Sequence, residues 1–382
     1  MRCRWNNLLG IIGVVLLMGV CGCKPYQYVA NNNDLTTKSI YSQMQRVAKW
    51  QLDSIAHKGW RHPKGNWTSA TLYAGLYGWY QVSKDSATLN FLTQVADSLH
   101  WAFPEGKGRY HADNYCVGQL YCLLYEVDKK QQRIAALKLL VDSITSRPHT
   151  ESLEWKNDIA SRQWAWCDAL FMGPPTIAML AKQTGNRNYM NLVDRLWWQS
   201  SDYLYDKKER LYYRDSRYFT KKEKNGQPVF WSRGNGWVLA GLATVLEYMP
   251  EDYWDRRYWV ARFKEMAGRV ASLQQADGTW HASLLDPASY PGKETSGTAF
   301  YCYALAWGIN HGILSASEYS STVDRAWEAL VGCLHNNGKL GFVQAIGADP
   351  RHVNFDDTEF YGVGGFLLAG KEMMELHKLP ES

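Results

Sequence analysis

The links between the apolar periodic segments of this 382-residue chain alternate between short and long. The short links lie within the usual range for adjacent packed helices and span residues 83–86, 127–130, 184–187, 249–254 and 310–317. The long links span residues 57–66, 103–113, 147–162, 205–231, 276–294 and 336–360. Because helices joined by short turns run antiparallel, every long link leaves the same end of the body. We therefore predict one rim that carries long loops, where binding and catalysis tend to lie.

The apolar segments predict a ring of paired helices. The expected helices span about 36–56, 67–82, 86–101, 113–127, 130–146, 165–183, 187–204, 234–248, 255–274, 295–310, 317–335 and 361–377. The first of each pair has a single apolar face, whereas the second is apolar nearly all round, which indicates burial on every side. Six outer helices around six inner ones form an all-α (α/α)6 barrel. A helical repeat solenoid is the competing architecture, but no self-similarity at a fixed period supports it.

Short β elements are expected in the long links of this one rim. In the link 205–231, residues 211–214 form a candidate strand of a β-hairpin, and Asn225-Gly226 is a turn signal. Residues 279–284 and 340–344 are further candidate strand pieces. None of them is large enough to change the fold class.

Composition favours one globular domain over residues 36–382, because hydrophobic residues make up 46% and charged residues 21%. The net charge of +5 is spread thinly, without a basic cluster among aromatics, so nucleic acid is not an expected partner. The chain has 18 Trp and 24 Tyr against 11 Phe. Rings with polar atoms suit a wet, sugar-binding site, although core packing is the alternative for any single Trp.

The N-terminus is typical of an exported bacterial lipoprotein. Arg2 and Arg4 precede an apolar run over residues 8–20, which is too short to be an ordinary membrane span. Cys23 follows Gly22, as the lipidated Cys does in a bacterial lipobox. We expect residues 1–22 to be a lipoprotein signal peptide, Cys23 to anchor the protein to a membrane, and residues 23–35 to be a tether.

Cysteine and histidine spacing gives no support for a metal or another cofactor. Five cysteines follow Cys23, an odd number scattered through expected helices, which is not a disulfide framework. The sequence has no CxxC pairing and no HExxH helix. We therefore expect no cofactor.

Polar residues in the long links precede the inner helices, where free N–H groups and the helix dipole favour an anion. An acidic substrate fits that rim. Asp168 lies between Trp166 and the run 169–172, surroundings that raise a carboxyl pKa and make a proton donor. The alternative is an N-cap, which would stabilise the carboxylate. Asp113 presents the same two readings, and two carboxylates on one rim can share acid and base roles.

The motif over residues 231–237 suggests a second contact with an acidic ligand. Arg233 offers a planar fork for a carboxylate, and Gly234 and Gly236 let the backbone approach a ligand closely. Trp237 lies one helical turn after Arg233. The alternative is a glycine-rich loop with a salt-bridged surface Arg.

Together these residues resemble glycoside hydrolase family 105, the unsaturated glycuronyl and rhamnogalacturonyl hydrolases. The resemblance runs from about residue 36 to the end and is carried by residues 166–172, by residues 231–237 and by their spacing to Asp113-Asn114. It implies an (α/α)6 barrel. It also implies an oligosaccharide substrate that a lyase has left with a terminal C4=C5 uronic acid, which the enzyme hydrates until the product falls apart.

The resemblance also implies roles for single residues. Asp168 would donate a proton to C4 and help activate water for C5, while Asp113 would position or assist. Arg233 would pair with the acidic ring, and the pocket would be lined by Trp67, Trp166, Trp231 and Trp237.

The chain departs from the family in the expected hairpin. Some members carry a His where this chain has Arg214, which either faces the pocket or pairs with Asp215. An Arg in the pocket would alter the preferred uronic acid or the next sugar. An inverting glycosidase or a sugar epimerase of the same barrel class, and a lipid-anchored glycan-binding protein without turnover, are the competing functions.

Overall fold

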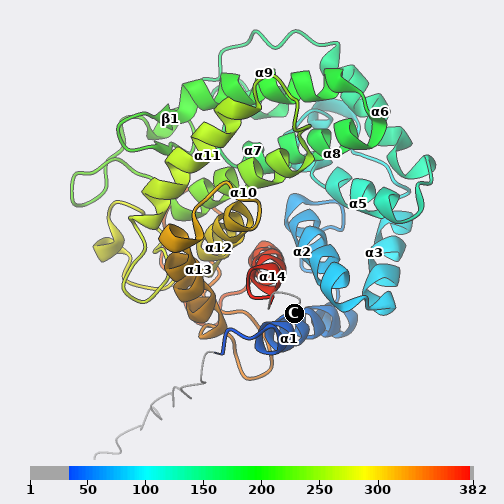
Figure 1. The fold of residues 1–382 in the computed structure, drawn as a ribbon. Helices are drawn as coiled ribbons and strands as arrows, with labels where there is room; N and C mark the ends of the chain where they lie inside the picture. Colours follow the sequence, from blue (N-terminus) through cyan, green and yellow to red (C-terminus); the bar gives the residue numbers. More distant parts are fainter. Residues whose placement is uncertain (1–33, 379–382) are drawn as a thin grey trace, which may run out of the picture. The chain divides into compact units, whose positions relative to one another are not determined.

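Helices in chain order close into a ring in the computed structural model, which describes residues 34–378 (Figure 1). The outer helices are α1 (Thr37–Lys58), α3 (Ser86–Ser98), α6 (Gln132–Thr145), α9 (Arg187–Leu204), α11 (Arg256–Ala271) and α13 (Ala316–Val331). The inner helices are α2 (Trp67–Ser83), α4 (Ala112–Tyr115) with α5 (Gly118–Asp128), α7 (Ala169–Met172) with α8 (Pro174–Thr184), α10 (Ser232–Tyr248), α12 (Thr295–Asn310) and α14 (Phe360–Leu376). Each inner helix contacts the next, and α14 contacts α2, so the inner ring is closed. The predicted (α/α)6 barrel is confirmed.

Small residues allow the inner helices to pack closely. Where α2 meets α14, a Cβ atom added to Gly75 would lie 2.4 Å from the carbonyl oxygen of Gly364. Backbone atoms cannot move aside easily, so an alanine at either position would push the two helices apart. The glycine content of the inner helices is thus a packing requirement.

Two inner helices are divided, where the sequence predicted continuous ones. The segment 165–183 breaks at Gly173, because Pro174 has no N–H to continue the hydrogen bonds of α7. The segment 113–127 breaks at Cys116, whose carbonyl accepts a short-range hydrogen bond from the Gln119 N–H. Both breaks lie on the rim that carries the long links.

The strands are short, as predicted, but one partner differs. Strand β1 (Tyr205–Asp206) pairs antiparallel with β2 (Leu211–Tyr212), so the predicted extended piece finds its partner across the turn 207–210. The Asn225-Gly226 turn instead closes an isolated bridge between Lys222 and Pro228. The other two strand pieces contribute single bridges, Trp231–Ser283 and Leu334–Leu340. Four 3₁₀ turns complete the described links, namely η1 (Gly106–Gly108), η2 (Ile159–Ser161), η3 (Ser216–Tyr218) and η4 (Pro287–Ser289).

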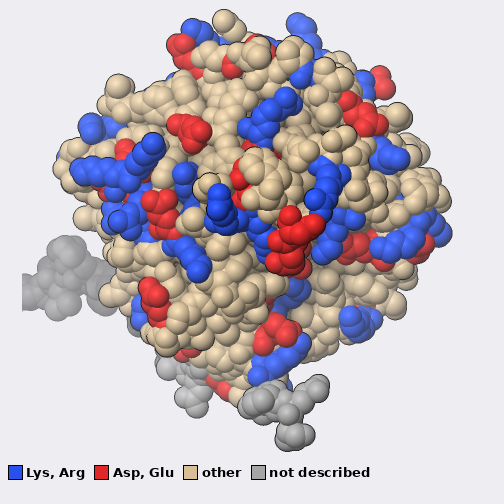
Figure 2. Space-filling model, turned by 45° about the horizontal axis from the view of Figure 1, so that its top comes forward, with Lys and Arg blue, Asp and Glu red and all other residues tan. Residues whose placement is uncertain are grey.

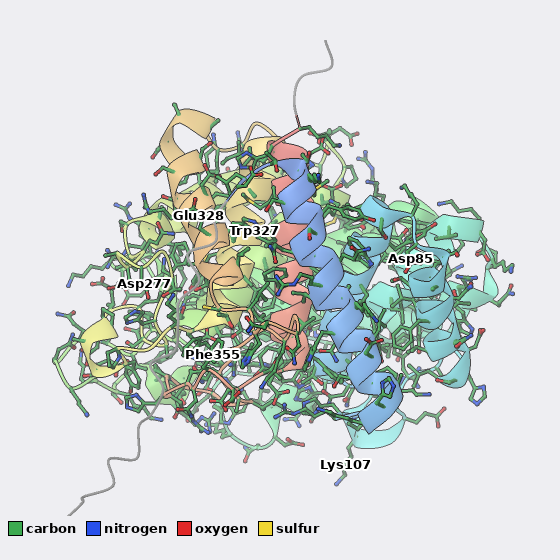
Figure 3. All side chains as sticks on the ribbon, turned by 90° about the horizontal axis from the view of Figure 1, so that it is seen from below. Asp85, Lys107, Asp277, Trp327, Glu328 and Phe355 are labelled. Carbon is green, nitrogen blue, oxygen red and sulfur yellow. The ribbon has the colours of Figure 1, made fainter. Side chains whose placement is uncertain are left out.

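The long links gather at one end of the barrel. Figure 3 shows Lys107 and Phe355, from two long links, lower in the view than Asp85, which belongs to a short link. Figure 2 shows one face of the molecule, on which Lys and Arg are interspersed with Asp and Glu. Cys23 and the expected signal peptide lie outside the described residues, and no described helix has the length and apolarity to cross a membrane.

Candidate active site

Asp168 stands directly before α7 and makes no side-chain capping hydrogen bond there. The residue is 8% exposed, and the Cys167 thiol donates to its Oδ2 over 3.5 Å. Burial raises the pKa of Asp168, although the neighbouring Arg214 and Arg233 oppose the rise. The capping alternative therefore does not describe this carboxyl, and burial shifts its pKa in the direction that a proton donor needs.

Asp113 lies in the first turn of α4, where the cap is His111 and not Asp113 itself. The His111 Nδ1 accepts the Asp113 N–H over 3.3 Å and lies 3.8 Å from its Oδ2. Burial, and then the charge of Asp168, raises the pKa of Asp113 to about 7. Because each carboxylate disfavours ionisation of the other, the pair retains a proton near neutral pH. Burial, and then the Arg214 charge, lowers the pKa of His111, so its imidazole is neutral there.

Arg214 pairs with Asp215, as one of its two predicted readings has it, and also faces Asp168, while its contact with a substrate stays a prediction. Its Nη1 donates to Asp215 Oδ2 over 2.6 Å, while its Nε lies 3.5 Å from Asp168 Oδ2. Although burial opposes it, hydrogen bonds from Arg217 and Arg214 hold the pKa of the buried Asp215 below its usual range. Asp215 is therefore an ionised anchor that aims Arg214 at Asp168.

Backbone contacts fix this arrangement further. The Cys167 N–H donates to the Arg214 carbonyl over 2.8 Å, which ties the segment before α7 to the segment after β2. Asn235 accepts the Tyr212 N–H over 2.7 Å and donates to the Tyr212 carbonyl over 3.0 Å. The asparagine of the 231–237 motif therefore holds the hairpin from which Arg214 projects.

Crowding around Gly234 explains why the motif has a glycine at the start of α10. A Cβ at this position would lie 2.9 Å from the Trp231 ring and 3.0 Å from Cys167 Sγ. Gly234 therefore packs against Trp231 and against Cys167, the neighbour of Asp168, and the predicted close approach to a ligand stays a prediction.

Arg233 is almost fully enclosed, with 1% of its surface exposed. Its Nη1 and Nη2 donate to the carbonyls of Gln344 and Ala345 over 2.7 and 3.0 Å, and its guanidinium lies 4.4 Å from the Trp231 ring. Its Nε is buried without a hydrogen-bond partner among residues 34–378. These contacts hold the 336–360 link against α10. Recognition of a substrate carboxylate by Arg233 stays a prediction.

Of the four predicted tryptophans only Trp67 is partly exposed, since Trp166, like Trp231, is 2% exposed. Trp166 contacts His111 at 4.7 Å between ring centroids and so borders the carboxylate pair. Trp67 is partly exposed and stacks on Tyr361 at 5.3 Å. Trp231 and Trp237 are 2% and 0% exposed. For Trp237 the structure supports the core-packing alternative, while the predicted substrate contacts of the other three remain untested.

Sequence reasoning did not select three residues of this site. They are His111, Trp155 and Arg217. The Arg214 and Arg217 guanidinium groups each lie 4.6 Å from the Trp155 ring. Trp155 lies in a long link, and that position is the signal that was available. Among residues 34–378 no group of three or more His, Cys, Asp or Glu side chains is placed to hold a metal ion.

Comparisons with known proteins give consistent matches over almost the whole chain. The family model described as Glycosyl Hydrolase Family 88 matches residues 31–377. The chain is 35% identical to the unsaturated 3S-rhamnoglycuronyl hydrolase of Formosa agariphila, over 98% of this chain and 100% of that protein.

Two solved structures are similar at 30% identity. A family 88 glycosyl hydrolase from Bacteroides vulgatus has a TM-score of 0.80 and covers 89% of this chain and 99% of its own. A protein named as a polysaccharide lyase has a TM-score of 0.82 and covers 91% and 99%.

Proposed function

The chain belongs to glycosyl hydrolase family 88, and from that membership we propose that it removes a terminal 4,5-unsaturated uronic acid from lyase-generated oligosaccharides. It is a glycoside hydrolase. The observation that carries the proposal is the buried, uncapped carboxyl of Asp168 beside a second carboxyl, Asp113, with the pKa of each raised. This pair can hold and move the proton that hydration of a double bond requires.

The proposed reaction uses the one proton that the carboxylate pair holds. Asp168 delivers the proton that the carboxylate pair holds to C4, and the electron pair of the double bond forms the new C–H bond. Positive charge then develops at C5 and is shared with the ring oxygen, and the water oxygen forms its new bond to C5. The proton lost by that water returns to the carboxylate pair, which restores its proton. The hemiketal at C5 opens to a ketone and leaves a hemiacetal at C1, which collapses to an aldehyde as its glycosidic C1–O bond breaks; the hydroxyl proton goes to the departing oxygen of the next sugar. Water is the only reactant besides the substrate, and the carboxylate pair is regenerated.

Arg214 supports this cycle by its position. The guanidinium favours the ionised form of Asp168 after proton transfer, while burial favours the protonated form before it. A pKa balanced between these two effects allows one carboxyl to act first as an acid and then as a base.

We further propose a rhamnoglycuronyl substrate, since the Formosa agariphila relative carries that name and matches over its full length. The Arg214 and Arg217 guanidinium groups beside Trp155 supply positive charge next to the carboxylate pair. An acidic oligosaccharide is the ligand class that suits such a pocket.

Export and lipidation at Cys23 belong to the same proposal. Anchoring at a bacterial membrane would place the hydrolase where lyase products of an external polysaccharide arrive. The support is the sequence pattern of Arg2, Arg4, the apolar run 8–20 and Cys23.

The test is an ultraviolet assay on purified protein. An unsaturated rhamnoglycuronyl disaccharide should lose the absorbance of its double bond, and the Asp168→Asn protein should leave it unchanged. A saturated disaccharide is the substrate control and should not be cleaved by either protein.

The assay also separates the competing functions. A lyase would increase the absorbance of the intact polysaccharide, because it creates double bonds. An ordinary glycosidase would cleave the saturated disaccharide, and a binding protein would change neither absorbance. Any of these three outcomes, without loss of the double bond in the unsaturated disaccharide, contradicts the proposal.

A further inference from the structure

An outer groove of about 680 Å³ lies on the barrel wall, away from the residues assigned to the candidate active site. Its lining comes from three elements. Trp198 belongs to α9, Arg210 ends the turn between β1 and β2, and α11 with its N-cap contributes Asp255, Tyr258, Arg262 and Glu265. The groove therefore crosses two outer helices and reaches the hairpin turn.

Arg262 is held rigidly in the wall of this outer groove. Its guanidinium lies 3.8 Å from the Tyr205 ring, and its Nη1 donates to Ser201 Oγ and Tyr212 Oη over 2.6 and 3.0 Å. Its Nε lies 3.5 Å from the Glu265 carboxylate. Among residues 34–378 no hydrogen-bond acceptor contacts its Nη2. One donor of a fixed, positively charged fork is thus left for a ligand.

Arg210 adds a second cation at the hairpin end of the groove. Its backbone has φ +55°, and its N–H donates to the Asp206 carbonyl over 2.7 Å, so the turn fixes where the side chain begins. The side chain is exposed and forms no ion pair within the described part of the chain. The lining also holds Asp255 and Glu265, so its formal charge is balanced, and the Arg210 side chain is the cation that a ligand carboxylate can pair with directly.

One exposed ring lines the groove, and a second, outside the lining, precedes it in the sequence. Tyr258 is 49% exposed, and the nearby Trp254 is 70% exposed at the start of α11. Arg257 lies 4.7 Å from the Tyr258 ring and donates to its hydroxyl over 2.8 Å, which orients the ring. An exposed ring whose orientation is fixed offers a flat apolar face on which a sugar ring can stack.

We propose that the outer groove is a second, non-catalytic binding site for an acidic saccharide chain. Sugar rings would stack on Tyr258 and Trp198, a uronate carboxylate would pair with Arg210 and Arg262, and Asp255 would accept hydroxyl hydrogen bonds. The inference rests on the proposed function, since the ligand is the polysaccharide whose lyase products the active site hydrolyses. A long chain held here would remain near the enzyme while its ends are processed.

The experiment measures binding without turnover, by titration calorimetry of the full chain with a saturated hexasaccharide of alternating rhamnose and glucuronate. We expect Arg210→Gln and Tyr258→Ala each to weaken binding by at least about tenfold. Lys138→Gln and Leu139→Ala, at exposed positions on α6, are the matched controls and should bind like the wild type. A neutral hexasaccharide of glucose should bind more weakly than the acidic one.

A parallel assay separates this inference from the proposed function. Both groove variants should hydrolyse the unsaturated disaccharide at the wild-type kcat/KM, because that substrate fills only the active site. The inference is overturned if the groove variants bind the hexasaccharide like the controls. It is also overturned if excess unsaturated disaccharide displaces the hexasaccharide from the inactive Asp168→Asn protein. Failure of the wild type to hydrolyse the disaccharide would instead contradict the proposed function.

Discussion

Replacing Asp113 with Asn should stabilise the protein at alkaline pH while reducing turnover. In the folded protein, burial and the charge of Asp168 raise the pKa of Asp113 from 3.8 to about 7. The unfolded chain therefore loses this proton at lower pH than the folded protein does. Below about pH 4 both states hold the proton and no penalty exists. The loss of folding free energy that comes from ionising Asp113 grows as pH rises and is complete above about pH 7. An amide cannot ionise, so Asp113→Asn removes this loss at alkaline pH.

The size of the effect follows from the same shift. A pKa rise from 3.8 to about 7 corresponds to about 4 kcal/mol of lost stability at full ionisation. The side chain is 25% exposed, so screening by solvent reduces the expected gain to about 1–2 kcal/mol. The opposing effect, an acidic residue in a first helical turn, contributes about 0.3–1 kcal/mol, and α4 has only four residues. The gain should therefore prevail.

Thermal unfolding at pH 4 and pH 8 checks this prediction. Asp113→Asn should leave Tm nearly unchanged at pH 4 and raise it by roughly 1–3 °C at pH 8. Asp85→Asn is the control, since a hydrogen bond from Thr88 lowers the pKa of Asp85 and makes its charge stabilising. Its Tm at pH 8 should not rise. An equal loss of Tm for Asp113→Asn at both pH values would show that Asp113 only supports α4, and would refute the reasoning.

Three further outcomes are expected. Asp168→Asn should lower turnover by about 10²- to 10⁴-fold without lowering Tm, as measured by the ultraviolet assay and a thermal melt; near-wild-type turnover would exclude a proton-donor role. Arg233→Lys should lower the free energy of unfolding by about 1.5–3 kcal/mol, because an ammonium cannot serve the Gln344 and Ala345 carbonyls as a planar fork. The same substitution should lower kcat/KM for the free-acid substrate more than for its methyl ester. Equal losses would show that Arg233 only holds the 336–360 link in place. Mass spectrometry of protein from a bacterial membrane should find lipid on Cys23, whereas an unmodified chain that begins elsewhere would contradict anchoring.

The helices were predictable because their signals are local. The outer helix α9 has a single apolar face and the inner helix α12 is apolar throughout, and both begin and end where the sequence indicated. The break between α7 and α8 is also encoded locally, in Gly173-Pro174, but the apolar run that continues across it predicts one continuous helix. Pairing of short strands was less accessible, because a turn signal such as Asn225-Gly226 does not specify which segments flank it in a ladder.

The site shows the opposite dependence, on contacts between distant segments. The raised pKa of Asp168 was readable from its apolar neighbours, yet its pairing with Arg214 depends on a hairpin that Asn235 holds from another link. Arg233 is the sharper case. Its type and its glycine neighbours indicated a carboxylate fork, but its hydrogen bonds run to Gln344 and to a carbonyl 112 residues away. Backbone carbonyls are offered by every residue type, so no side-chain pattern announces them as partners. A guanidinium in a glycine-rich loop is therefore ambiguous in sequence between a ligand contact and a loop clamp, and only the fold decides which acceptors reach it.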